Sequence, residues 1–248
     1  WLFTPLRNAG PVRCWKPVEK LSSISARYNP ARAGQSLRDK NNACRLVVLI
    51  SGSGTNLQVI IDQCADGEIP GRVVGVISNE PSVRGLERSA HAGIPGVVID
   101  HRDHKTRNDF EVALGRQIDS YKPDLVILAG FMRILGNNLV RRYRGRMLNI
   151  HPSLLPDYPG LNTHERAVAD RIAEHGATVH FVIPQLDAGP IVVQGRVQVH
   201  PSDTPAALAQ RVHEVEYQIY PQAIRWFAQG RLTLQDNCAC LDGVPIRL

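Results

Sequence analysis

The sequence lacks a hydrophobic run long enough to cross a membrane. Its longest apolar stretch runs only from Leu125 to Met132, whereas a spanning helix needs roughly 20 residues. The chain has 248 residues and a hydrophobic content of 43%, which is ordinary for a globular protein. We therefore expect a sizeable core, no transmembrane segment and no membrane partner.

Cysteines are few, and their spacing does not suit a metal site. The chain holds five, an odd number, and Cys238 and Cys240 form a C-x-C motif without a second pair. A structural zinc site requires two such pairs at defined spacing. We therefore expect no metal ion, and thiols that stay reduced in a cytoplasmic location.

The main part of the chain also lacks an excess of basic charge. The formal net charge is +6, but residues 1–43 contain eight basic and two acidic residues and account for all of it. Residues 44–248 hold 21 of each sign. Since phosphate contacts from Lys and Arg dominate nucleic-acid binding, we expect small-molecule substrates and no nucleic-acid partner.

Residues 1–43 show no lasting helix or strand period and are rich in Arg, Ser and Pro. Such a segment buries too little apolar surface to offset its ordering entropy. A transit peptide, upstream translation and an artefact all remain open, because the segment is basic and acid-poor and begins at Trp1 rather than Met. We expect a disordered basic extension at 1–43, followed by one domain at 44–248.

Strand-like and helix-like segments alternate through the first half of this domain. The expected strands are 45–50, 72–78, 97–99, 124–129 and 147–151, and the expected helices are 57–61, 84–91, 109–121 and 138–143. The alternation predicts an α/β fold with a Rossmann-like, doubly wound, mainly parallel sheet.

The second half of the domain follows a different pattern. It predicts helices at 163–173 and 205–228 (interrupted near Pro221), strands at 177–183, 191–199 and 232–234, and a turn at 242–243. Residues 184–190 are too few to contain a crossover helix. The strands on either side of them are therefore expected to be antiparallel and to extend the sheet.

A glycine-containing loop, Gly52-Ser53-Gly54, joins the first strand to the first helix. Glycines allow close approach of the backbone to an anion, and the N–H groups at a helix start point toward it. The third glycine of the dinucleotide motif and the lysine of the P-loop are absent. A phosphate monoester therefore fits best, with a purely geometric turn as the alternative.

Asn149 and His151 stand two residues apart on an expected strand, so their side chains project from the same face. An amide and an imidazole aimed together can stabilise a developing oxyanion and move a proton. A histidine that only satisfies backbone groups at a strand end is the alternative. His180, on an apolar strand, is equally compatible with a core position and with a supporting role in the site.

Several motifs in order carry a resemblance to a known family. They are residues 50–58, 129–135, 148–156, 180–182 and 186–190. From about residue 45 to about residue 243, the sequence closely resembles the phosphoribosylglycinamide formyltransferases, which are folate-dependent enzymes of purine synthesis.

The resemblance implies roles for individual residues. Its catalytic residues are Asn149, His151 and Asp187; its nucleotide-binding residues are Gly54, Thr55, Asn56 and Glu216; its folate-binding residues are Arg107, Met132, Arg133, Ile134, Leu135 and Asn149. Residues 183–187 are expected to close over the folate. Ala188 replaces a frequent glycine and Asn162 a frequent histidine, and Ala188 could change how the turn at Asp187 closes.

The implied reaction moves the formyl group of 10-formyltetrahydrofolate, a co-substrate, to the amine of 5'-phosphoribosylglycinamide. The expected enzyme uses no metal and is a monomer or a homodimer. The alternatives are a formyltetrahydrofolate hydrolase, a methionyl-tRNA formyltransferase and a non-catalytic phosphate-binding protein. The first two relatives carry a further domain, and the third gives no reason for Asn149, His151 and Asp187 to occur together.

Overall fold

The computed structural model describes residues 43–247, and all but the last residue of the predicted N-terminal extension lies outside this range. The strands are β1 (Cys44–Ile50), β2 (Gly71–Ser78), β3 (Gly96–Val98), β4 (Leu125–Leu128), β5 (Met147–His151), β6 (Glu174–Phe181), β7 (Ile191–Gln198), β8 (Leu232–Gln235), β9 (Cys238–Leu241) and β10 (Val244–Pro245). The helices are α1 (Thr55–Ala65), α2 (Arg84–His91), η3 (His101–Asp103), α3 (Arg107–Ser120), α4 (Asn137–Arg142), α5 (Thr163–Ala169) and α6 (Pro205–Ala228).

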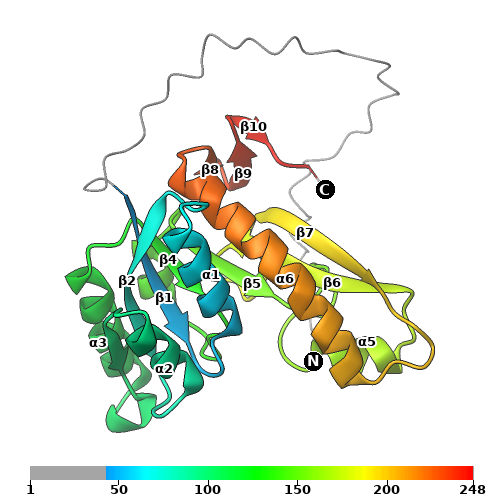
Figure 1. Ribbon diagram of the computed structural model, residues 1–248, viewed down its shortest axis with the longest axis horizontal. Coiled ribbons are helices and arrows are strands. Elements are labelled where there is room, and N and C mark those ends of the chain that lie inside the picture. The colour runs from blue at the N-terminus through cyan, green and yellow to red at the C-terminus, as the bar shows by residue number, and fades with distance from the viewer. Residues whose placement is uncertain (1–42, 248) are drawn as a thin grey trace, which may run out of the picture. The chain divides into compact units, whose positions relative to one another are not determined.

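Seven strands form the main sheet, in the order β3-β2-β1-β4-β5-β6-β7 (Figure 1). The first five in this order are parallel, whereas β6 is antiparallel to β5 and to β7. This confirms the predicted parallel sheet with an antiparallel extension. Because β2 and β4 lie on opposite sides of β1, the winding reverses beside β1, and open α/β sheets bind ligands at the carboxyl ends of strands at such a point.

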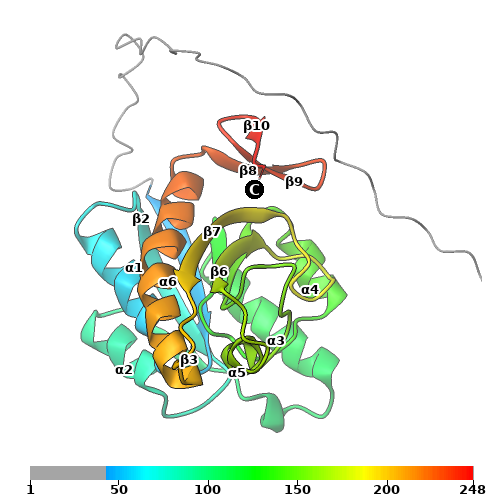
Figure 2. The ribbon, with the colours of Figure 1, turned by 90° about the vertical axis from the view of Figure 1, so that its right-hand side faces the viewer.

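Helices cover both faces of the sheet. Apolar residues of α1, α5 and α6 belong to one buried cluster, and those of α3 and α4 belong to a second; Figure 2 shows α1 and α6 on one side and α3 and α4 on the other. Strand β1 contributes Leu46, Val48 and Ile50 to the first cluster, and Val47 and Leu49 to the second. Its unbroken apolar sequence is thus explained by burial on both faces.

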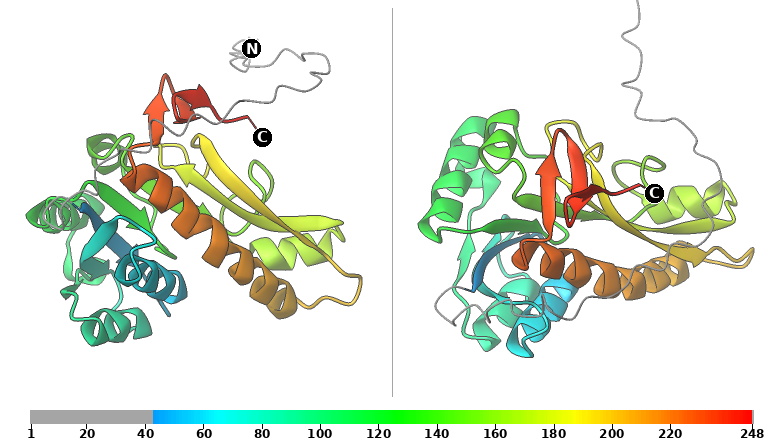
Figure 3. Two further views of the ribbon diagram at one scale, coloured as in Figure 1. Left: turned by 45° about the horizontal axis from the view of Figure 1, so that its top comes forward. Right: turned by 90° about the horizontal axis from the view of Figure 1, so that it is seen from above.

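Helix α6 runs alongside β6 and β7 (Figure 3) and has the predicted bounds. The predicted interruption near Pro221 is wrong, because the helix continues through this residue. Pro221 has no N–H to donate, but Tyr220 and Ile224 beside it are fully buried against the sheet. Such packing supplies most of a helix's stability in a folded protein.

The same helix ties two central strands together. The Tyr220 hydroxyl lies 2.9 Å from the carbonyl oxygen of Leu128 at the end of β4 and 3.0 Å from that of Leu148 in β5.

No helix in the described part of the chain combines the length and the apolar content that a bilayer crossing requires.

Two element boundaries in the second half differ from expectation by three residues or more. Helix α5 ends at Ala169, four residues early, and β6 begins at Glu174 instead of residue 177. The reason is that Arg171 adopts a left-handed conformation with φ of 52°, and its N–H bonds back to the carbonyl oxygen of Val168. This closes the helix. The turn at Asp242-Gly243 occurs as predicted, between β9 and β10, two strands that were not predicted.

Candidate functional site

A cavity of about 750 Å³ opens at the carboxyl edge of the parallel strands. Its walls come from the chain after β1 and after β4, the end of β5, the start of α5, the β6–β7 loop and α6. Every site residue implied by the resemblance lines this cavity except Arg107. The structure therefore brings together residues that are as far apart in sequence as Gly54 and Glu216.

Three groups implied as catalytic meet on one side of the cavity. His151 Nδ1 lies 3.4 Å from Asp187 Oδ2, and the two side chains are only 7% and 8% exposed. Asp187 Oδ1 lies 3.9 Å from His180 Nε2, which in turn lies 3.2 Å from Asn149 Nδ2. An amide, two imidazoles and a carboxylate thus form one continuous cluster.

The hydrogen bonds of His180 define its tautomer. Its Nδ1 lies 3.0 Å from the carbonyl oxygen of Phe181, and since a carbonyl only accepts, Nδ1 carries the hydrogen. Nε2 is then the acceptor for the amide of Asn149, the residue directly opposite in the β5–β6 ladder. Burial lowers the pKa of His180 and so favours this neutral form.

This tautomer orients the Asn149 side chain. One hydrogen of its NH₂ group bonds His180, so the second remains available to a substrate oxygen in the cavity. The sequence left the role of His180 open, because residue type alone does not give the strand register. The structure resolves this choice: His180 is buried and also holds a cavity-lining amide in one orientation.

His151 and Asp187 are each fixed by a backbone group. His151 Nε2 donates to the carbonyl oxygen of Tyr158 at 2.9 Å, so Nδ1 is the ring nitrogen that faces Asp187. Asp187 Oδ2 accepts the N–H of Gly160 at 2.9 Å. Asp187 has a left-handed φ of 50°, and an added Cβ at Gly189 would overlap the carbonyl oxygen of Phe181, so this turn requires glycine there.

The glycine loop after β1 leaves the start of α1 open. Gly54 is the N-cap residue with φ of 69°, and no side chain caps this helix end. The loop is fixed from the side by α2, because the Gly85 N–H donates to the Gly52 carbonyl at 3.1 Å and Arg88 Nε donates to the Ser53 carbonyl at 2.9 Å. Uncapped N–H groups on a rigid turn suit an anion.

Asn56 and Glu216 form a hydrogen-bonded pair in the lining of the cavity. Asn56 Nδ2 donates to Glu216 Oε2 at 2.8 Å. Burial raises the pKa of Glu216, which is 5% exposed, while the bond from Asn56 opposes this shift. Asn56 Oδ1 is buried without a partner among the described residues. The pair thus offers acceptor oxygens to hydroxyl or amine donors of a ligand.

Unusually exposed apolar side chains surround the other end of the cavity. Met132, Ile134, Leu161 and Leu186 all line it and are each more than 50% exposed. Met132 and Ile134 belong to the segment that follows β4, and Ser51 anchors this segment because its hydroxyl accepts the N–H of Met132 at 2.8 Å. Clustered exposed apolar residues around a cavity indicate a ligand with a large apolar surface. Sequence reasoning missed Ser51 and Leu161.

Arg107 lies outside the cavity lining. Its Nη2 donates to the carbonyl oxygen of Ile134 at 2.8 Å, and its Nε pairs with Glu111 at 2.7 Å. The guanidinium is therefore attached to the wall of the cavity from outside. A direct folate contact by Arg107 stays a prediction, and in this structure the residue supports the segment that carries Ile134.

No group of three or more His, Cys, Asp or Glu side chains among residues 43–247 is placed to hold a metal ion. Cys238 and Cys240, the C-x-C pair, lie in β9, away from the cavity lining.

A buried histidine behind the cavity predicts a loss of stability in acid. Burial, and then the nearby His164, lower the pKa of His175 to about 4 from its ordinary 6.5, and the residue is 1% exposed. Between pH 6.5 and 4, His175 is protonated in the unfolded chain but neutral in the folded chain. The free energy of unfolding therefore falls as pH drops below 6.5 and stops falling below 4. We expect a loss of about 2 kcal/mol between pH 7 and 5.

Urea unfolding at several pH values measures this effect. His175→Leu keeps an apolar side chain at the buried position and is expected to flatten that part of the pH dependence, whereas His200→Leu, at an exposed position, is expected to leave it. An unchanged slope in His175→Leu would show that another group titrates.

Comparisons with known proteins agree with this geometry. The sequence profile of the formyl transferase family matches residues 44–224. The phosphoribosylglycinamide formyltransferase of Escherichia coli is 48% identical over 198 residues, covering 80% of this chain and 93% of the relative. That of Haemophilus influenzae is 47% identical over 199 residues, with 80% and 94% covered.

Solved structures give the same result. The phosphoribosylglycinamide formyltransferase of Coxiella burnetii superposes with a TM-score of 0.79 at 50% identity, over 83% of this chain and 96% of the other. A formyltetrahydrofolate deformylase of Burkholderia mallei superposes with a TM-score of 0.73 at only 27% identity, over 80% and 70%. The chain therefore belongs to the formyl transferase family.

Proposed function

We propose that the chain transfers the formyl group of 10-formyltetrahydrofolate to the amine of 5'-phosphoribosylglycinamide, giving formylglycinamide ribonucleotide in purine synthesis. The observation that carries this proposal is that Asn149, His151 and Asp187 share one cavity with the open start of α1. The relatives that are 47% and 48% identical have the corresponding name, whereas the hydrolytic relative is much more distant.

In the proposed reaction, the amine nitrogen attacks the formyl carbon, and the carbonyl oxygen becomes an oxyanion. The free N–H of Asn149 is the neutral donor to that oxygen. His151 in its protonated form is the second, charge-assisted donor, through the Nδ1–H that it shares between Asp187 and that oxygen. When the bond between the formyl carbon and N10 of the folate breaks, N10 takes up a proton and the amine loses one.

Asp187 completes the proton path. Its carboxylate lies 3.4 Å from His151 Nδ1, close enough to stabilise an imidazolium and to exchange a proton directly or through one water. The N–H of Gly160 holds one carboxylate oxygen in place. Proton transfer therefore requires little rearrangement of these two side chains.

The two ends of the cavity suit the two substrates. We assign the ribonucleotide phosphate to the N–H groups of Thr55 and Asn56 after Gly54, and the ribose hydroxyls to Glu216. The folate ring system lies against the exposed apolar side chains near Met132 and Ile134. Arg133 and Leu135 line the cavity in the same segment as Met132 and Ile134. Residues 183–187 form the opposite wall.

The remaining parts of the proposal concern the whole protein. We propose that residues 44–248 form one domain, that the enzyme acts in the cytoplasm as a monomer or homodimer, and that it binds small molecules only. The formal charge balance of residues 44–248 supports the absence of a nucleic-acid partner.

One assay tests the proposed function. Purified protein is given 10-formyltetrahydrofolate with glycinamide ribonucleotide, with water alone, or with aminoacylated tRNA, and the formylated product is quantified. We expect rapid formylation of the ribonucleotide and only slow release of formate. If formate were released at a comparable rate with water alone, the chain would instead be a formyltetrahydrofolate hydrolase.

Replacing Gly54 tests the phosphate loop. Gly54→Ala places a Cβ 2.6 Å from the Gly85 Cα in a backbone with φ of 69°, which we expect to cost about 1–3 kcal/mol of stability and to raise KM for the ribonucleotide at least tenfold. Gly67→Ala is the matched control, since its φ is 77° but its Cβ would meet nothing within 4 Å.

Steady-state kinetics and urea unfolding of both variants separate the two effects. The control is expected to lose stability without a change in KM. An unchanged KM in Gly54→Ala would place the phosphate elsewhere.

A further inference from the structure

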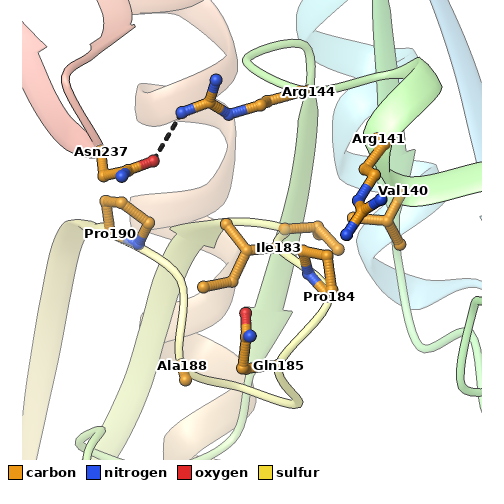
Figure 4. Close-up of a pocket in the computed structure, with 10 residues that line it drawn as sticks. Val140, Arg141, Arg144, Ile183, Pro184, Gln185, Ala188, Pro190 and Asn237 are labelled. Carbon is orange, nitrogen blue, oxygen red and sulfur yellow. Dashed lines mark hydrogen bonds between the residues drawn. The ribbon is translucent and has the colours of Figure 1, made fainter. Parts of the chain in front are cut away.

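A second cavity, of about 390 Å³, lies on the outer side of the β6–β7 loop. Figure 4 shows its walls: the C-terminal end of α4, the loop that carries Ile183 to Pro190, and Asn237 from the turn between β8 and β9. Its size is within the range of small-molecule sites. The proposed catalytic function assigns nothing to this cavity.

The charge around this cavity is positive. Arg141 and Arg144 both line it, and no carboxylate is among the described residues that do. Arg144 Nη2 donates to Asn237 Oδ1 at 2.5 Å, so an amide rather than an acid faces its guanidinium. The Arg141 guanidinium makes no hydrogen bond or ion pair with any residue of the described range, and it lies beside Pro184 (Figure 4). Two guanidiniums without counter-charges suit an anion.

The rest of the lining is largely apolar. Val140, Val182, Ile183 and Pro190 supply carbon surface, and the Gln185 amide supplies a polar group. A simple inorganic anion would leave this carbon surface uncovered. We propose that the cavity is a binding site for an organic anion, with its carboxylate or phosphate on Arg141 and Arg144 and its apolar body against the loop.

The site shares a wall with the main cavity. Val140 and the segment Val182–Gln185 line both cavities, and Asp187 follows two residues later. A ligand in the outer cavity requires this segment in its present position, which is also the position that shapes the folate end of the main cavity. Because coupling between two sites is reciprocal, the outer ligand tightens folate binding and folate tightens the outer ligand.

Calorimetric titration at low ionic strength tests binding, with phenyl phosphate, benzoate and inorganic phosphate as probes. The main cavity is first saturated with glycinamide ribonucleotide and tetrahydrofolate, so that the glycine loop is filled. We expect phenyl phosphate or benzoate to bind, and the stronger of the two to identify the anionic group. Inorganic phosphate is expected to bind at least tenfold more weakly than phenyl phosphate.

Variants locate the site. The double variant Arg141→Ala/Arg144→Ala is expected to weaken probe binding at least tenfold, while Arg116→Ala, an exposed arginine outside both cavities, leaves it unchanged. Neither variant touches the proposed catalytic groups, so turnover without probe reports separately on the proposed function. Saturating probe is also expected to lower KM for the folate in the wild type and in Arg116→Ala, but not in the double variant.

Equal probe affinity in the double variant and the wild type would overturn the proposal. So would an unchanged KM for the folate at saturating probe, or displacement of the probe when tetrahydrofolate is added to protein that was titrated without it.

Discussion

Asn149→Ala is expected to lower kcat by about 10²–10³, the usual cost of losing one donor to an oxyanion. Its NH₂ group is fixed by His180 with one hydrogen and offers the other to the cavity. Because the oxyanion exists only near the transition state, the lost interaction lowers kcat far more than it changes substrate binding.

Single-turnover kinetics with both substrates saturating measure this effect. Asn138→Ala is the matched control, because Asn138 is exposed on α4 and outside both cavities. We expect the control to keep wild-type rates. A kcat for Asn149→Ala within a few-fold of the wild type would remove the amide from the proposed oxyanion site.

His151→Ala is expected to lower kcat by at least 10²–10³, because it removes both a charged donor and a group that moves the proton. His151 Nε2 is already used by the carbonyl of Tyr158, so the loss falls on Nδ1, which faces Asp187. The substitution also leaves the Asp187 carboxylate, 8% exposed, without its imidazole partner. We therefore expect some loss of stability as well.

Two measurements separate catalysis from folding in this variant. Equilibrium dialysis with the ribonucleotide is expected to give near wild-type affinity, because the proposed phosphate site lies on α1. His200→Ala, at an exposed position, is expected to behave as the wild type. If His151→Ala kept substantial turnover at neutral pH, the histidine would be only a structural residue at the strand end.

The fold was predictable from the sequence where local pattern and burial agree. The continuous apolar residues of β1 indicated a strand buried on both faces, and the structure places them in both apolar clusters. Prediction failed where tertiary packing decides. Pro221 was expected to interrupt α6, but burial of Tyr220 and Ile224 keeps the helix continuous. The premature end of α5 depends on a left-handed Arg171, which no sequence period reveals.

The site was predictable to a lesser degree. Strand alternation alone put Asn149 and His151 on one face, but only the resemblance pointed to Asp187, whose approach depends on the β6–β7 loop. The role of His180 required the antiparallel register, which places it opposite Asn149. Positions far apart in the chain, such as Ser51 beneath Met132, gave no local signal.

A crystal structure of the protein with glycinamide ribonucleotide and a non-transferring folate analogue tests the central claim most directly. We expect the phosphate on the N–H groups after Gly54, and the amine next to the cluster of Asn149, His151 and Asp187. The folate is expected against Met132. A nucleotide bound with its phosphate away from α1, or with its amine too far from Asn149 for any transfer, would contradict the account.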